Sequence, residues 1–227
     1  MSDLLPSLLT AIMDDDRGTA KESLSKDPLL SGRLIEEASY ESRITHWIYA
    51  GDTALHVAAA AYRVEIANML LAAGADPNAA RNHRRSRPLH YASDGCLDNP
   101  TWDAKRQVAI IRILLEAGAD LHAQDKNGAT PLHRAVRTRC AATVACLLEA
   151  GSDVNMQNKS GSTPFHLAVQ NTGRGGSGAE KARAAQREII QAFLAKGVRP
   201  ALQDRKGKSV LQWARSGSIR ELLQPHA

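Results

Sequence analysis

Residues 127–133 read NGATPLH, and residues 160–166 repeat the pattern as SGSTPFH. The histidines that end the two stretches, His133 and His166, are 33 residues apart (166 − 133). A fixed period of that size is typical of stacked structural repeats rather than of a domain with one unique core. The repeated stretch therefore decides the fold of the chain.

The residues of each repeat predict two antiparallel helices. Thr130 can cap a helix, and Pro131 suits the first helical position because its φ is fixed and its missing N–H costs nothing there. Further on, the apolar residues 144, 147 and 148 have the i, i+3, i+4 spacing of one face of a second helix, which Gly151 ends. A helix pair of this size cannot bury its apolar face alone, so we expect the repeats to stack.

The pattern resembles the ankyrin repeat. The match rests on TPLH at residues 130–133 and on the Gly118-Ala119-Asp120 sequence that follows a pair of leucines. The resemblance implies an all-α solenoid of stacked helix pairs, with a short β-hairpin "finger" projecting between successive pairs. It also implies that the concave face, built from the finger tips and the first helices, binds another macromolecule.

The repeats predict the organisation of the chain. We expect residues 1–43 to form an N-terminal helical pair, a degenerate capping repeat, followed by a linker or a third short helix. Residues 44–227 then hold about five repeats, and the shortened last one forms a C-terminal cap with Trp213 in its core. No stretch approaches the roughly 20 apolar residues of a membrane span.

Two of the repeats are longer than the others. The interval from the finger histidine to the glycine that ends the second helix is 28 residues in one (118 − 90) and 31 in another (197 − 166), against 18 elsewhere (151 − 133). These differences predict insertions near residues 96–106 and 173–185, both between the first and second helices. In a solenoid, insertions at equivalent points project from the same edge, which gives a second candidate surface.

Composition narrows the possible functions. The formal net charge of +5 indicates an acidic partner. Three cysteines, without CxxC spacing, and the lack of a basic-then-apolar leader favour a cytoplasmic protein.

Sequence patterns for catalysis, metals or cofactors are weak. The finger histidines recur one per repeat, so they cannot converge on one metal ion, and in ankyrin repeats such a histidine hydrogen-bonds backbone groups of the turn. Residues 173–178 read GRGGSG and formally satisfy GxGxxG, but a helix precedes them where the dinucleotide motif needs a strand. We therefore expect no enzyme activity, no metal and no cofactor, with an enzyme or metal site between the two insertions as one alternative.

Basic residues are enriched in the predicted fingers, and they are the main candidates for partner contacts. Aligned on a stack they would form a positive strip along the finger tips; the alternative is a solubilising surface without a target. The residues we expect to contact a partner are Tyr49, Arg84, Arg85, Lys126, Arg137, Lys159 and Arg205, with Trp102 as an anchor on the first insertion.

The expected function is that of a non-enzymatic protein–protein interaction module, monomeric when free. The partner is expected to be a protein with an acidic surface. Nucleic acid binding through the basic strip is an alternative, which we place second because stacking aromatic residues are not interleaved with the basic ones. The short length resembles small bacterial ankyrin proteins, some of which neutralise a partner, so inhibition is one expected role.

Overall fold

The computed structural model describes residues 4–95, 102–171 and 179–226. The chain divides into two compact units, an N-terminal unit of Met1–Lys126 and a C-terminal unit of Asn127–Ala227. In both, the regular secondary structure is almost entirely short helices, as the repeat pattern predicts. No helix in the described ranges is long and apolar enough to cross a membrane.

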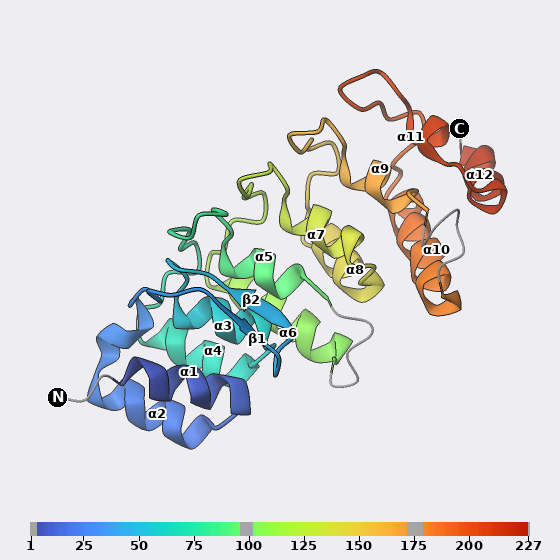
Figure 1. The fold of residues 1–227 in the computed structure, drawn as a ribbon. Helices are drawn as coiled ribbons and strands as arrows, with labels where there is room; N and C mark the ends of the chain where they lie inside the picture. The colour runs from blue at the N-terminus through green and yellow to red at the C-terminus, as the bar shows by residue number, and fades with distance from the viewer. Residues whose placement is uncertain (1–3, 96–101, 172–178, 227) are drawn as a thin grey trace. The chain divides into compact units, whose positions relative to one another are not determined.

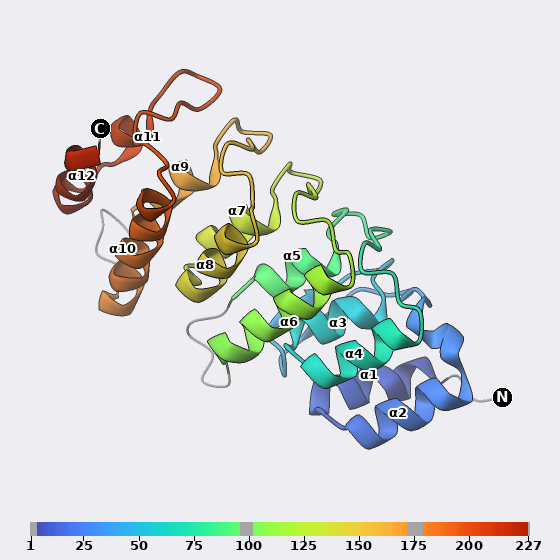
Figure 2. The same ribbon diagram turned by 180° about the vertical axis from the view of Figure 1, so that it is seen from behind.

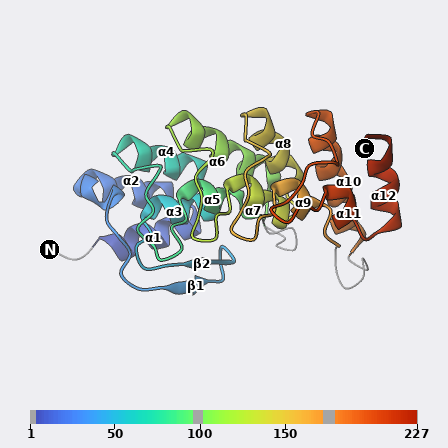
Figure 3. The same ribbon diagram turned by 90° about the horizontal axis from the view of Figure 1, so that it is seen from above.

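The N-terminal unit is a stack of three helix pairs (Figure 1). The first helices α1, α3 and α5 pack on one another in order, and so do the second helices α2, α4 and α6, so the unit has two helical layers (Figure 3). The elements are α1 (Leu5–Asp14), α2 (Arg17–Lys26), the 3₁₀ helix η1 (Pro28–Ser31), α3 (Ala54–Ala60), α4 (Val64–Ala72), α5 (Pro88–Ser93) and α6 (Ala104–Glu116).

The core of this unit lies between the two layers. It contains fully buried branched side chains on every pair, among them Leu8, Leu55, Ile66, Leu89 and Ile110. Helix α3 packs closely on its neighbours because it is mostly alanine and is buried along its whole length. Burial of each large side chain contributes about 1.5–3 kcal/mol to folding.

A β-hairpin precedes the first finger of the N-terminal unit. Strand β1 (Ser39–Glu41) pairs antiparallel with β2 (His46–Ile48), with Tyr40 opposite Trp47. The hairpin lies along the layer of first helices, and β2 contacts α3 (Figure 3). The region expected to be a linker or a third short helix, residues 31–43, therefore contains strand β1, and the expected boundary after residue 43 falls inside the hairpin.

The C-terminal unit repeats the same construction (Figure 2). Helix α7 packs on α8 and α9, while α10 packs on α8 and α9. The stacked rings of Phe165 and Phe193, 4.9 Å apart, join α9 to α10 in the core. The elements are α7 (Pro131–Arg137), α8 (Ala141–Glu149), α9 (Pro164–Ala168), α10 (Glu180–Ala195), α11 (Val210–Trp213), α12 (Gly217–Leu223) and η3 (Gln224–His226).

The two longer repeats have longer second helices. Helix α6 has 13 residues and α10 has 16, whereas α4 and α8 have 9 each. Residues 104–106 and 180–185 of the expected insertions are therefore extra helical turns. Residues 96–101 and 172–178, which hold most of the remaining insertion residues and the GRGGSG sequence, lie outside the described residues.

Candidate functional site

Two of the basic fingers are closed by a side chain that accepts hydrogen bonds from the backbone across the turn. In the N-terminal unit, Asn82 Oδ1 accepts from the N–H groups of Arg84 (3.1 Å) and Ser86 (3.0 Å). In the C-terminal unit, Asp204 Oδ1 accepts from the N–H groups of Lys206 (2.8 Å) and Lys208 (2.9 Å). Asn and Asp stabilise turns in this way. The basic residues are thus carried on ordered loops.

Backbone hydrogen bonds also join successive finger tips inside each unit. In the N-terminal unit, Lys126 N donates to Arg84 O at 2.7 Å. In the C-terminal unit, Lys159 N donates to Asn127 O at 2.9 Å, and Arg205 N donates to Gly161 O at 3.0 Å. The side chains of Lys126, Lys159 and Arg205 are exposed. Each unit therefore presents its cations on linked tips.

Glycines allow the tips to approach one another this closely. A Cβ atom on Gly51 would lie 2.6 Å from Arg81 O, and one on Gly161 would lie 2.3 Å from Arg205 Cβ. Both glycines also have positive φ, as does Gly128. The finger of residues 82–87 is the exception, because Arg85 occupies the corresponding position with a φ of 52°.

The finger histidines are structural, as expected. Nε2 of His56 lies 3.1 Å from Ser86 O, and Nε2 of His133 lies 3.0 Å from Ser162 O, so each ring reaches the next finger. Nδ1 of His56 accepts from the N–H of Thr53 at 3.0 Å. Burial lowers the pKa of His56, although the Asp52 carboxylate partly offsets this effect. The pKa of His166 is also lowered by burial.

Aromatic residues and an arginine form one continuous surface on the N-terminal unit. Tyr40, Trp47, Tyr49, His83 and Arg84 make up this aromatic–arginine surface. The Tyr40 and Trp47 rings are 5.7 Å apart, and Trp47 stacks on Tyr49 at 6.3 Å with 18° between the ring planes. His83 meets Tyr49 edge-on at 4.9 Å.

Arg84 is held in place on this surface by Tyr49. Its Nη1 donates to Tyr49 Oη at 2.7 Å, and its guanidinium carbon lies 5.2 Å from the centre of the ring. Tyr40 and Trp47 are 52% and 51% exposed, so about half of each residue is available to a partner. Trp, Tyr and Arg are the residues enriched in interface hot spots.

The structure brings together some of the predicted site residues but not all of them. Tyr49, Arg84 and Lys126 are joined by the contacts described above, and Arg85 follows Arg84. In the C-terminal unit, Arg205 Nη1 donates to Lys159 O at 3.4 Å.

Trp102 and Arg137 lie outside the fingers. Trp102 precedes α6, is partly buried and donates from Nε1 to Gln107 Oε1 at 2.8 Å. Arg137 is exposed at the end of α7. Tyr40 and His83 were not predicted as site residues, because the contacts that join the hairpin and the second finger to Tyr49 are distant in sequence.

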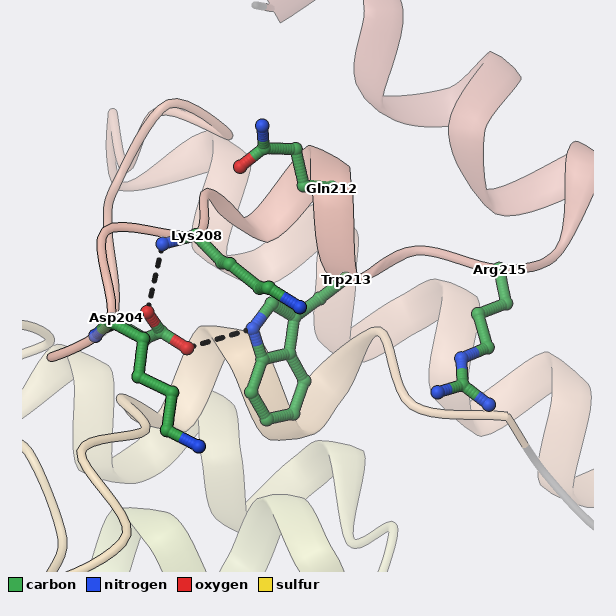
Figure 4. Close-up of a pocket in the computed structure, with 6 residues that line it drawn as sticks. Asp204, Lys208, Gln212, Trp213 and Arg215 are labelled. Atoms are coloured by element: carbon green, nitrogen blue, oxygen red, sulfur yellow. Dashed lines mark hydrogen bonds between the residues drawn. The ribbon is translucent and has the colours of Figure 1, made fainter.

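A second feature lies at the C-terminal cap, where Trp213 lines two hollows. One, of about 210 Å³, is shown in Figure 4, and the other is about 250 Å³. Trp213 Nε1 donates to Asp204 Oδ2 at 3.0 Å, and the ring meets His166 edge-on at 5.4 Å. The residues that line the first hollow are Asp204, Lys206, Lys208, Gln212, Trp213 and Arg215.

This geometry corrects the expectation that Trp213 lies in the core, because its side chain is only partly buried. Each hollow is smaller than the roughly 300–1,000 Å³ of ordinary small-molecule sites. The first hollow combines the acidic Asp204 with three basic lining residues, and the second has Arg215 as its charged lining residue.

The ends of α5 and α9 are held by side chains that the sequence did not identify. Gln107 Nε2 donates to Ala92 O at 2.9 Å, and Gln186 Nε2 donates to Ala168 O at 2.7 Å. Tyr62 Oη donates to Asp94 O. These bonds supply side-chain donors to carbonyl groups at helix ends, where intrahelical donors run out.

Arg139 performs the corresponding role in the C-terminal unit. Its guanidinium donates to Ala168 O (3.1 Å) and Gln170 O (2.9 Å). Tyr62 and Arg139 both have positive φ, 55° and 62°, in the turn between the helices of a short repeat. In each unit, the short repeat therefore donates side-chain hydrogen bonds to carbonyl groups of the longer repeat that follows it.

Within residues 4–95, 102–171 and 179–226, no three His, Cys, Asp or Glu side chains are grouped as a metal site would require. The alternative of an enzyme or metal site between the insertions concerns residues 96–106 and 173–185, of which 96–101 and 173–178 lie outside the described ranges.

Comparison with known proteins agrees with the helix-pair architecture. A family model described as "Ankyrin repeat" matches residues 50–82, and one described as "Ankyrin repeats (3 copies)" matches residues 102–177. Over 85 residues the chain is 36% identical to the "E3 ubiquitin-protein ligase KEG" of Arabidopsis thaliana. That match covers 37% of this chain and 5% of the plant protein, so the chain spans only a small part of the relative's length.

Proposed function

Since this chain is an ankyrin-repeat protein, we propose that it binds an acidic segment of a partner protein along its finger tips. Ankyrin repeats are generic protein–protein interaction modules and are typically non-catalytic. The observation that carries the proposal is the set of backbone bonds between tips, Lys126 to Arg84 in one unit and Arg205 to Gly161 in the other. Ordered loops lose little entropy when they bind, so a few charged contacts are sufficient.

The charges at the tips support an acidic partner. Lys126, Lys159 and Arg205 are exposed, whereas the acidic residues Asp125 and Asp204 in the same fingers are buried. Each unit therefore offers cations to solvent at its tips. We propose that the chain binds its partner as a monomer in the cytoplasm through these cations. We further propose that capture of the acidic segment inhibits the partner.

A charge-reversal experiment tests this proposal. The variant Arg85→Glu/Lys159→Glu/Arg205→Glu is compared with Lys105→Glu/Arg112→Glu/Lys196→Glu, which changes the net charge equally at exposed positions on α6 and at the end of α10. Tagged proteins are incubated with nuclease-treated lysate at moderate salt, and the retained proteins are identified by mass.

We expect one stoichiometric protein to be retained by the unmodified chain and by the control variant, and to be lost from the finger variant. Equal retention by both variants would contradict the proposal. Thermal unfolding of the two variants should match within a few degrees, because exposed charges contribute little to stability.

A further inference from the structure

Three aromatic rings follow one another across the hairpin and the first finger of the N-terminal unit. They run from Tyr40 to Trp47 to Tyr49, with ring centres 5.7 and 6.3 Å apart. Basic residues of the next finger lie beside the last ring. Arg84 lies over Tyr49, and the side chains of Arg81 and Arg85 in the same finger are exposed. The sequence led us to expect no such mixture of aromatic and basic residues, and for this surface the expectation was wrong.

The support under the rings is fixed by hydrogen bonds and burial. The hairpin is anchored to the start of the first repeat, because Ile35 N donates to Asp52 O at 2.7 Å and Gly51 N donates to Ile35 O at 2.8 Å. Ile44 and Ile48 of the hairpin are buried. The rings are therefore already placed before a ligand arrives, which reduces the entropy lost on binding.

The charges beside the rings favour a polyanion. Lys126 N donates to Arg84 O, so a further lysine belongs to the neighbouring tip. The Asp52 carboxylate does not cancel this charge at the surface, because it is buried and accepts hydrogen bonds from Asn82 and Tyr91. The acidic residues nearest in sequence are the exposed Glu36 and Glu37 before β1 and the partly exposed Glu41 in β1. Glu41 is paired with Arg43 at 3.8 Å, and the four cations Arg81, Arg84, Arg85 and Lys126 outnumber these three carboxylates.

We propose that the aromatic–arginine surface, with Arg81, Arg85 and Lys126, binds single-stranded nucleic acid. Bases stack on Trp47 and Tyr40, and phosphates lie against the four cations. Stacking on aromatic side chains beside a basic track is how proteins hold single strands without reading their sequence. The bases of a duplex stay paired, so a duplex would contact only the cations. An acidic peptide has no bases to stack on the rings, so it would also contact only the cations.

The test uses a fluorescein-labelled oligothymidylate of roughly 12 nucleotides, within the site sizes of single-strand binders. Anisotropy gives the affinity, and Trp47→Phe and Trp47→Leu separate stacking from apolar contact. We expect Trp47→Phe to bind nearly as well as the unmodified chain. Trp47→Leu should bind roughly 5- to 150-fold more weakly, the equivalent of losing one stacked base. Leu29→Ala, at an exposed apolar residue of η1, outside the hairpin and the fingers, serves as the control.

Salt and competitors give independent readouts. The logarithm of the association constant should fall against the logarithm of salt concentration with a slope of about −3, the value for four neutralised phosphates on a single strand. Arg81→Gln/Arg85→Gln should reduce that slope by about half. Equal affinity of Trp47→Leu and Trp47→Phe, or equal competition by duplex DNA or by polyglutamate of matched charge, would overturn the proposal.

This inference shares Arg84, Arg85 and Lys126 with the proposed protein site, and the two binding measurements separate the two proposals. A chain that retains its protein partner but fails to bind oligothymidylate would disprove the nucleic acid site alone. Preferential binding of polyglutamate over oligothymidylate would assign the aromatic–arginine surface to an acidic protein segment instead.

Discussion

Asn82 donates a hydrogen bond to Asp52 across 2.7 Å inside the N-terminal unit, joining the first finger to the second. Both side chains are buried, with 2% and 0% of their surfaces exposed. Asn82 also donates to Ser86 O at 2.7 Å, so one amide group connects the second finger to the buried carboxylate. The fingers of this unit thus share a polar core of their own.

Replacing Asn82 by Ala should lower the free energy of unfolding by about 2–3 kcal/mol. The change removes a bond to a buried charged group and leaves backbone N–H groups of the finger unpaired, each at a cost of about 1–3 kcal/mol. Urea unfolding followed by circular dichroism measures the effect. Ser160→Ala, at an exposed finger position, should change the midpoint little, and an equal shift for both variants would contradict the prediction.

Replacing Arg85 by Gly should stabilise the chain by about 0.5–1 kcal/mol. A left-handed conformation costs a non-glycine residue roughly 1–2 kcal/mol, and the glycine variant avoids this cost. The larger conformational entropy of glycine in the unfolded state offsets about 0.5–1 kcal/mol of the resulting stabilisation. The same variant should bind the oligonucleotide more weakly because a cation is lost. Thermal unfolding is the readout. Ser160→Gly, where φ is not positive, should be neutral or slightly destabilising.

Arg139 and Gln186 should show strong coupling, because they share the carbonyl oxygens of Ala168 and Gln170. Either side chain alone can still satisfy both acceptors. We therefore expect Arg139→Leu and Gln186→Leu to cost about 1 kcal/mol each, and the double variant to cost about 1–3 kcal/mol more than their sum.

A double-mutant cycle by chemical denaturation measures this coupling. Gln107→Leu with Arg139→Leu is the comparison, since these residues have no common acceptor, and their effects should add within about 0.5 kcal/mol. Additivity in the first cycle would show that the two side chains act independently.

Stability should fall as the pH is lowered below about 6.5, the ordinary histidine value. Burial lowers the pKa values of His56 and His166 in the folded chain. The unfolded state therefore binds more protons between the lowered value and about 6.5, which makes stability rise with pH in that window. Each histidine contributes at most about 1.4 kcal/mol per pH unit.

The last finger offers a natural control for the pH prediction. There Gln212 Oε1 accepts from Ser209 N at 2.8 Å, just as His56 Nδ1 accepts from Thr53 N. His56→Gln should therefore keep the cap, reduce stability at neutral pH modestly and flatten the pH dependence. A pH profile of unfolding midpoints that keeps its slope in His56→Gln/His166→Gln would assign the dependence to other groups.

The sequence was sufficient to predict the helix pairs, since their signals are local. Thr130 and Pro131 begin α7, as their cap and φ preferences require, and the 33-residue period placed the fingers. The exposure of Lys126, Lys159 and Arg205 at the tips was also predictable from their place beside turn residues.

The hairpin and the side-chain hydrogen bonds at the ends of α5 and α9 were not predicted, for different reasons. Strand β1 has three residues, too few for an alternation of apolar and polar side chains to be recognised. Its position beside Tyr49 depends on contacts that are distant in sequence. Gln107 and Gln186 did carry a signal, because each precedes the glycine that ends its helix by 11 residues (118 − 107 and 197 − 186). Only the structure explains why a polar residue is buried there.

The alternation of short and long repeats has a consequence for how such a chain can be lengthened. In each unit a short repeat supplies Tyr62 or Arg139 to the carbonyl groups of the longer repeat after it. Inserting one copied repeat would place two short or two long repeats in succession and leave one of these bonds without its donor or acceptor. Duplication in pairs preserves every such bond, so the two-repeat module is the element that recombination or design can copy without loss of stability.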